Sequence, residues 1–141
     1  MPFSRSLLVA VAVQLASQLF KVVFYSLRER RLRLDYFIST GGMPSAHTAF
    51  VSALTVSLGL HHGFASEFFT VAFVFSAIIV YDLVRVRGAV HAHSRILAML
   101  LEQVQLRQKV VLPHLVSHSL PEIIAGLVVG CAAAAAAYYL I

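Results

Sequence analysis

Residues 120–141 read LPEIIAGLVVGCAAAAAAYYLI, an apolar run with Glu122 as its one charged residue. A helix of about 17–25 mostly apolar residues is long enough to cross a bilayer. Three further runs approach this length, at residues 6–27, 44–60 and 67–83. The sequence therefore predicts an all-α integral membrane bundle of four transmembrane helices.

The composition supports a membrane protein. Of the 141 residues, 60% are hydrophobic and 12% are charged, and the mean hydropathy is +0.85. Soluble domains carry about 25% charged residues, so this chain has too little polar surface to face water on all sides. The one cysteine, Cys131, excludes an internal disulfide and a structural zinc site. We expect a single domain over residues 1–141.

The positive charges predict an orientation. The arginines cluster in two connections, at residues 28–40 and 85–119, whereas the turn at residues 61–66 has no Lys or Arg. Because positively charged connections stay in the cytoplasm, we expect both basic connections there and both termini outside, in the cell inner membrane. The basic residues lie at helix ends and no nucleic-acid-binding module is recognisable, so nucleic acid is not an expected partner.

Two further segments predict packing. Residues 84–115 mix apolar and basic residues at near-helical spacing, which predicts an interfacial amphipathic segment between the third and fourth helices. Gly126 and Gly130 form a G-x-x-x-G pair, which lets helices approach closely. Such a pair serves either as a dimer seam or, as we favour, in packing within the bundle. A homodimer is an expectation for a chain this small.

Lys21 and Arg28 are seven residues apart and share one face of the first helix. A lysine inside an apolar helix needs either a partner or a path to the lipid headgroups, and the sequence leaves both readings open. The stretch STGGMPSAH at residues 39–47 predicts a helix N-terminus, with Pro44 as its first helical residue. Free amides there, with Ser45 and His47, suit an anion, although an ordinary loop and cap gives the same pattern.

His118 and Glu122 lie four residues apart at the start of the last helix. A carboxylate that fixes the tautomer of an imidazole makes its other nitrogen a better base or nucleophile. Ser119 and Glu122 also match a capping box, which would give Glu122 a structural role. His114 extends a ladder that resembles a metal site, but the nearby prolines interrupt a helix there, so no metal is expected.

The charged residues converge on one level of the predicted bundle. Asp82 and Arg85 end the third helix on the side where the first helix ends and the second and fourth begin. Ionisable groups that gather at one membrane level are typical of a functional site.

At this point the motifs resemble a known family. Three motifs, Lys21-x6-Arg28, Pro44-Ser45-Ala46-His47 and His118-x3-Glu122, look like the signatures of the type 2 phosphatidic acid phosphatase superfamily, in order. The chain is identified, nearly end to end, as a member of its divergent PAP2 family of small integral membrane proteins. That closer resemblance rests on the following stretches: TGGMPSAH, Tyr81-Asp82 with Val86-Arg87, and the segment from His118 to Gly126.

The resemblance implies a phosphatase that needs neither metal nor cofactor. His118 would attack the phosphorus, Glu122 would orient it, and His47 would protonate the leaving alkoxide. The residues implied to hold the phosphoryl oxygens are Lys21, Arg28 and Ser45, with Gly41 and Gly42 supporting the loop. This division of roles suits phosphoryl transfer, which needs neutralised charge, a positioned nucleophile and a proton for the leaving group.

The chain departs from the superfamily pattern at four positions. They are Glu29 in place of proline, Ala46 in place of glycine, Glu122 in place of aspartate, and Leu112 in place of an arginine. The missing positive charge could come from Arg85, Arg87 or Arg95. The positions of Asp82 and Arg87 in the divergent family indicate a rebuilt site.

The sequence thus predicts an integral membrane lipid phosphatase. Its expected partners are membrane lipids, and its substrate is a lipid phosphate monoester of the phosphatidylglycerol phosphate or phosphatidic acid type, bound at the cytoplasmic face. One alternative is a non-catalytic lipid-phosphate or anion-binding membrane protein with a degenerate pocket. Another is a polyprenyl pyrophosphate phosphatase, if the topology is inverted.

Overall fold

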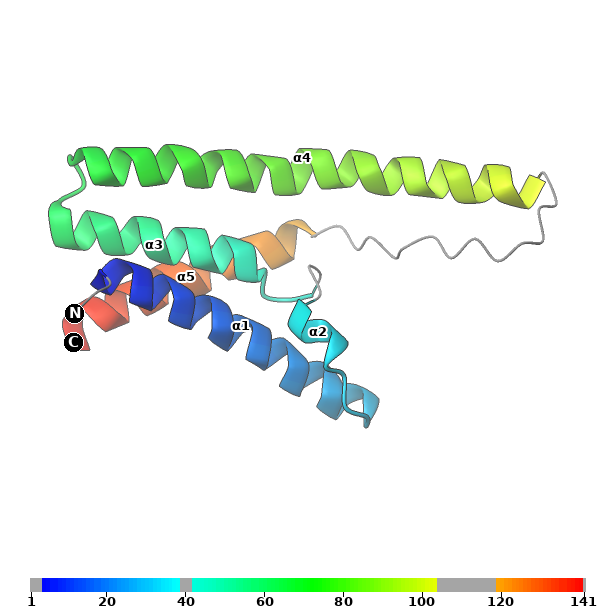
Figure 1. Ribbon diagram of the computed structural model, residues 1–141, viewed down its shortest axis with the longest axis horizontal. Helices are drawn as coiled ribbons and strands as arrows, with labels where there is room; N and C mark the ends of the chain where they lie inside the picture. Colours follow the sequence, from blue (N-terminus) through cyan, green and yellow to red (C-terminus); the bar gives the residue numbers. More distant parts are fainter. Residues whose placement is uncertain (1–3, 39–41, 104–118, 141) are drawn as a thin grey trace.

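The computed structural model describes residues 4–38, 42–103 and 119–140, and these residues are helical with short connections and no strand. The prediction of an all-α fold is therefore confirmed. The helices are α1 (Arg5–Glu29), α2 (Asp35–Ile38), α3 (Ala46–His62), α4 (Glu67–Gln103) and α5 (Leu120–Leu140), as Figure 1 shows.

Three of the described helices are long and apolar enough to cross a membrane, namely α1, α4 and α5. The fourth predicted span forms α3, which has 17 residues. Its length of about 26 Å falls short of the roughly 30 Å hydrocarbon core. Many of its buried residues are small or carry a hydroxyl, including Ala49, Ser52, Ala53 and Thr55. A short helix of this kind suits the centre of a membrane bundle, where small residues allow close packing.

α3 is the central helix, packed against α1, α4 and α5, and its most extensive contact is with α5. The G-x-x-x-G pair makes that contact. A Cβ added at Gly126 would overlap Thr48 Oγ1, and one at Gly130 would overlap Ser52 Oγ. Of the two readings of this motif, packing within the bundle is therefore confirmed.

α4 differs from the prediction, because it is one continuous helix of 37 residues. The apolar run predicts the end of the third helix at residue 83 and a separate amphipathic segment from residue 84. That boundary was wrong because the change from apolar to basic residues there marks no helix end. No proline interrupts the helix, and a single glycine, Gly88, is tolerated inside it. Residues 104–115 of the predicted segment lie outside the described residues.

Hydrogen bonds fix the register of α4 on α3. Thr55 Oγ1 and Ser76 Oγ are 2.8 Å apart, and Thr55 Oγ1 also donates to the Ala72 carbonyl at 3.3 Å. Ala46 precedes Thr55 by as many residues as Arg85 follows Ser76. Because the two helices are antiparallel, the start of α3 and Arg85 lie at a similar level.

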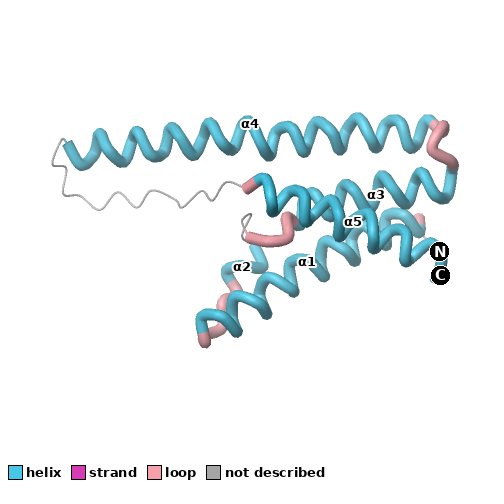
Figure 2. The backbone as a smooth tube through the Cα atoms, turned by 180° about the vertical axis from the view of Figure 1, so that it is seen from behind, coloured by secondary structure: helices cyan, strands magenta, loops and turns pink. Residues whose placement is uncertain are grey.

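The helix termini form two groups, one at each end of the bundle. The start of α1 and the end of α5 lie together near the α3–α4 turn, whereas α1 ends, and α3 and α5 begin, toward the opposite end (Figures 1 and 2). This arrangement agrees with the prediction that both basic connections leave the bundle on the same side.

Candidate functional site

Lys21 lies at the floor of the candidate site. It is on α1, and only 1% of its surface is exposed. A lysine that snorkels to the headgroups keeps its charged end in a polar environment at the surface, so the snorkelling reading does not hold here. The structure therefore favours the other reading, in which Lys21 has a partner within the bundle.

The described part of the glycine loop, residues 42–44, begins next to Lys21. Gly42 has a φ of +89°, a conformation that glycine adopts without steric cost. A Cβ at this position would be 3.1 Å from Tyr25 Cε2 and 3.4 Å from Lys21 Cδ. The expectation of an unusual backbone in the glycine pair is confirmed at Gly42, while Gly41 lies outside the described residues.

Ser45 is the N-cap of α3. It is fully buried, and its hydroxyl accepts a hydrogen bond from the Thr48 amide at 3.5 Å. The first helical residue is therefore Ala46, and the prediction that Pro44 takes this position was wrong. The physical reason is that serine is a strong N-cap, so the helix begins directly after it and Pro44 precedes the cap.

A second helix N-terminus meets the first one. The Ser45 amide donates to the Glu122 carbonyl oxygen at 3.0 Å, which joins the start of α3 to the start of α5. At α5 the Ser119 amide donates to Glu122 Oε2 at 3.3 Å. This is the carboxylate half of a capping box, so the capping reading of Glu122 is seen in the structure.

The charges of this cluster are complementary. The Glu122 carboxylate lies close enough to the buried Lys21 ammonium for the two charges to interact. Both helix N-termini add the partial positive charge of a helix dipole. One lysine and two helix dipoles against one carboxylate leave the cluster electropositive, which is the condition for binding an anion.

Of the two histidines of the predicted mechanism, His47 is among the described residues and His118 is not. His47 lies in the first turn of α3, partly buried, next to the N-cap Ser45. Its predicted position at a helix N-terminus is confirmed. His118 lies outside the described residues and directly precedes Ser119, the N-cap of α5. Its role as the nucleophile stays a prediction.

Arg28 lies in the last turn of α1 and is exposed. It lines one end of an apolar groove between α1 and α5, together with Tyr25 and with Met43 and Pro44 of the glycine loop. Arg28 thus lies at the exposed edge of the glycine loop, at one end of the groove, while Lys21 is buried.

Asp82 and Arg85 of α4 lie at a similar level to the candidate site but on the other side of α3. In Figure 1, α3 separates α4 from α1. Asp82 and Arg85 are exposed, and the Arg85 guanidinium carbon is 6.0 Å from the centroid of the Tyr81 ring. The structure does not gather these two residues with Lys21. Arg87 also belongs to α4, but its side chain is not among those described.

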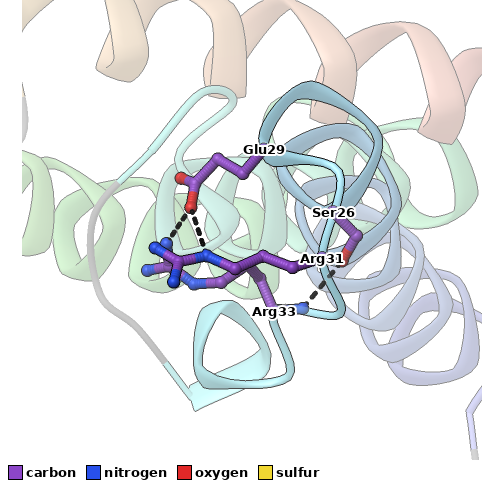
Figure 3. A network of polar contacts seen from close by, with 4 residues as sticks. All are labelled: Ser26, Glu29, Arg31 and Arg33. Atoms are coloured by element: carbon purple, nitrogen blue, oxygen red, sulfur yellow. Dashed lines mark hydrogen bonds and ion pairs between the residues drawn. The ribbon is translucent and has the colours of Figure 1, made fainter.

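Sequence reasoning missed the network that shapes the connection from α1 to α3 (Figure 3). The Glu29 carboxylate pairs with Arg33 and lies 3.6 Å from Arg31 Nε, and the Arg33 amide donates to Ser26 Oγ at 2.9 Å. The Arg33 guanidinium carbon lies 4.8 Å from the centroid of the Tyr36 ring. The i, i+4 spacing of Glu29 and Arg33 was the available signal.

Tyr36 links this network to the site. Its ring stacks on Tyr25 with centroids 4.2 Å apart and planes within 5°. Because Tyr25 contacts Gly42, the connection network supports the wall against which the glycine loop rests.

No group of three or more His, Cys, Asp or Glu side chains that could hold a metal is found in the part of the chain that the structure describes. His114 and His118 of the metal-like ladder lie outside that part.

Comparisons with known proteins agree with the motifs. The sequence model of the Divergent PAP2 family matches residues 3–133. An uncharacterized membrane protein of Bacillus subtilis strain 168, YuiD, is 38% identical over 81 residues, which are 57% of this chain. The matched part is 51% of the relative, so the similarity spans about half of its length. No solved structure matches the chain.

Proposed function

The chain belongs to the Divergent PAP2 family, and from this membership we propose that it is an integral membrane lipid phosphatase. The proposed substrate is a lipid phosphate monoester of the phosphatidylglycerol phosphate or phosphatidic acid type. The observation that carries the proposal is the meeting of two helix N-termini, at Ser45 and Glu122, beside the buried Lys21.

This cluster supports phosphate binding for a physical reason. A buried lysine is costly in a membrane protein and is usually retained for function. Backbone amides at helix N-termini bind phosphate oxygens directly, and the helix dipoles favour negative charge. Arg28 at the rim adds a guanidinium, which suits bidentate contact with a phosphate.

The proposed reaction proceeds in two steps. The His118 imidazole attacks phosphorus, the ester P–O bond breaks, and His47 gives its proton to the leaving alkoxide. Water then attacks the phosphorus of the phosphohistidine and gives a proton to His47, the P–N bond breaks, and inorganic phosphate leaves with both imidazoles restored. The position of His47 in the first turn of α3, close to the amides proposed to bind the phosphate, supports this role.

The proposed site faces the cytoplasm. The connection after α1 leaves the bundle at the end where α3 and α5 start. The basic residues around its start are Arg28, Arg30 and Arg31. Because positively charged connections favour the cytoplasm, the phosphate would lie in the cytoplasmic leaflet. This orientation supports a biosynthetic phospholipid intermediate as the substrate.

The test is phosphate release by detergent-purified protein without added metal. The substrates are phosphatidylglycerol phosphate, phosphatidic acid and undecaprenyl pyrophosphate, and the control is His118→Ala. We expect release from one phospholipid and a loss of several orders of magnitude in the variant. An unchanged rate in His118→Ala would contradict the proposed nucleophile.

A second candidate is a non-catalytic protein that binds a lipid phosphate or another anion. The capping contacts of Ser45 and Glu122 favour it, because both side chains already serve their helix starts. If the protein is a binder, His118→Ala keeps its affinity for phosphatidic acid. The wild-type protein then releases no phosphate. Binding by the wild type without release would favour this candidate over the enzyme.

A further inference from the structure

We propose that the groove between α1 and α5 holds an acyl chain of the substrate and that the Ser17 hydroxyl hydrogen-bonds to its ester carbonyl. The inference rests on the proposed function, because it names the lipid whose phosphate the neighbouring cluster would bind. It assigns the substrate to ester-linked phospholipids in preference to polyprenyl phosphates.

The groove has the size and lining of a hydrocarbon site. Its volume is about 770 Å³, within the range of small-molecule binding sites. The apolar lining comes from Val13, Phe20 and Phe24 of α1 and from Val129 and Ala133 of α5. Such a lining offers a hydrocarbon chain contact without any cost of burying polar groups.

Arg28, the charged residue of the groove lining, is at one end of the groove. Arg28 and the glycine loop close the end at the candidate site, and Val13 and Ala133 lie at the other end. Along α1 the separation of Arg28 and Val13 is about 22 Å, more than the roughly 15 Å of one leaflet's hydrocarbon. A phospholipid has the same polarity and length, with an anionic phosphate at one end of a long chain.

Ser17 breaks the apolar lining. It is 4% exposed, its hydroxyl oxygen is enclosed by the protein, and within the described residues this oxygen has no hydrogen-bond partner. Buried hydroxyls in membrane proteins almost always have one, so an unpartnered hydroxyl on a groove points to a ligand. In the proposed complex, rotation about the Cα–Cβ bond turns this hydroxyl from its enclosed position toward the groove that the residue lines.

The depth of Ser17 matches the chemistry of the lipid. Ser17 precedes Lys21 by four residues, so it lies on the same face of α1 and about 6 Å deeper. In a phosphatidic acid the ester carbonyls follow the phosphate along the molecule. A donor one helical turn below the phosphate-binding lysine is therefore at the level of the ester. A polyprenyl chain has no acceptor there.

The first test is photo-crosslinking in vesicles with phosphatidic acid that carries a diazirine at the end of one acyl chain. We expect the label near Val13 and Ala133, and little at Val128, which faces lipid elsewhere on α5 with 62% exposure. Ala16→Phe should fill the groove and abolish its labelling, whereas Ala12→Phe, on the same helix but outside the groove, should not. Equal labelling of Val128 and the groove, crosslinks to a second copy of the chain, or indifference to Ala16→Phe would overturn the proposal.

The second test is competition for this labelling by unlabelled lipids. In Ser17→Ala, the concentration of ester-linked phosphatidic acid that halves labelling should rise about tenfold, as expected for one lost hydrogen bond. The ether-linked analogue should compete equally with wild type and variant. The matched control is Ser6→Ala, a buried serine of α1 outside the groove. An equal change for both lipids would mean that Ser17 is structural and would overturn its assignment.

These readouts separate this inference from the proposed function, because crosslinking needs no turnover. Groove labelling that is sensitive to Ala16→Phe, without phosphate release from any lipid, would support the groove and contradict the phosphatase. Phosphate release together with labelling that Ala16→Phe does not change would support the phosphatase and contradict the groove.

Discussion

At the residue scale, the burial of Lys21 is the feature that most needs explaining. A charged side chain in an apolar helix costs roughly 2.5–3.5 kcal/mol at the bilayer centre. Here the Glu122 carboxylate offsets part of that cost, and Gly42 lies next to the lysine stem. From the sequence alone, snorkelling and an internal partner are equally favoured, because the position of Lys21 in its helix does not reveal which groups the neighbouring helices present.

Replacing Lys21 with methionine tests its role. Lys21→Met keeps the aliphatic stem under Gly42, so we expect the protein to fold, with a thermal midpoint close to that of the wild type. Phosphatidic acid binding and phosphate release should fall about 10- to 100-fold, since a charge-assisted contact is lost. Phosphate release assays and differential scanning fluorimetry measure the two effects. Unaltered phosphate release in Lys21→Met would show that Lys21 does not contribute to the site.

At the element scale, the helix starts and the α3–α5 contact position the site. The sequence predicted α1, α3 and α5 to within a few residues, because hydrophobic runs and caps are local signals. It did not predict where α4 ends, since no cap or breaker separates its apolar and basic parts. It also left open what packs on Gly126, because a small-residue motif does not identify its partner.

The α3–α5 contact predicts opposite effects at two helical glycines. Gly126→Ala should destabilise the protein by about 1–3 kcal/mol, because its Cβ would overlap Thr48 and the α3 backbone. Gly88→Ala on α4 is the matched control, since a Cβ there meets nothing within 4 Å, and it should stabilise the helix by up to about 1 kcal/mol. Unfolding in detergent by denaturant measures both. Equal effects would contradict the close packing of α5 on α3.

The connection network predicts a positional effect at Tyr36. Tyr36→Ala removes the ring that stacks on Tyr25, worth about 0.5–1.5 kcal/mol, and should loosen the glycine loop. We expect faster amide hydrogen exchange at residues 42–43, whereas Tyr36→Phe, which keeps the ring, should exchange as the wild type does. Unchanged exchange in Tyr36→Ala would show that the stack does not support the loop.

At the scale of the whole molecule, the arrangement of the helix ends gives the protein two different ends. The start of α1, the end of α5 and the α3–α4 turn share one end, and the helix starts that form the candidate site lie toward the other. Charge bias along the sequence was enough to predict this division. The separation of Arg85 from Lys21 by α3 was not predictable, because residues at one membrane level can still lie on opposite sides of a helix.

The orientation has a direct test. Reporter fusions at the two termini should both report the outer side of the membrane, because the basic connections favour the cytoplasm. Alkaline phosphatase, active outside, and a fluorescent protein, active inside, make a complementary pair. Cytoplasmic termini would move the site to the outer leaflet and favour a polyprenyl pyrophosphate as the substrate.

The most direct test of the central claim is to trap the covalent intermediate. Purified protein is mixed with phosphatidic acid or phosphatidylglycerol phosphate carrying a radioactive terminal phosphate, quenched within one turnover, and the labelled peptide is identified. We predict an acid-labile, alkali-stable phosphate on His118, absent from His118→Ala, with inorganic phosphate released as the label decays. Release of phosphate at the wild-type rate from His118→Ala, or no label and no release from either lipid, would contradict the account.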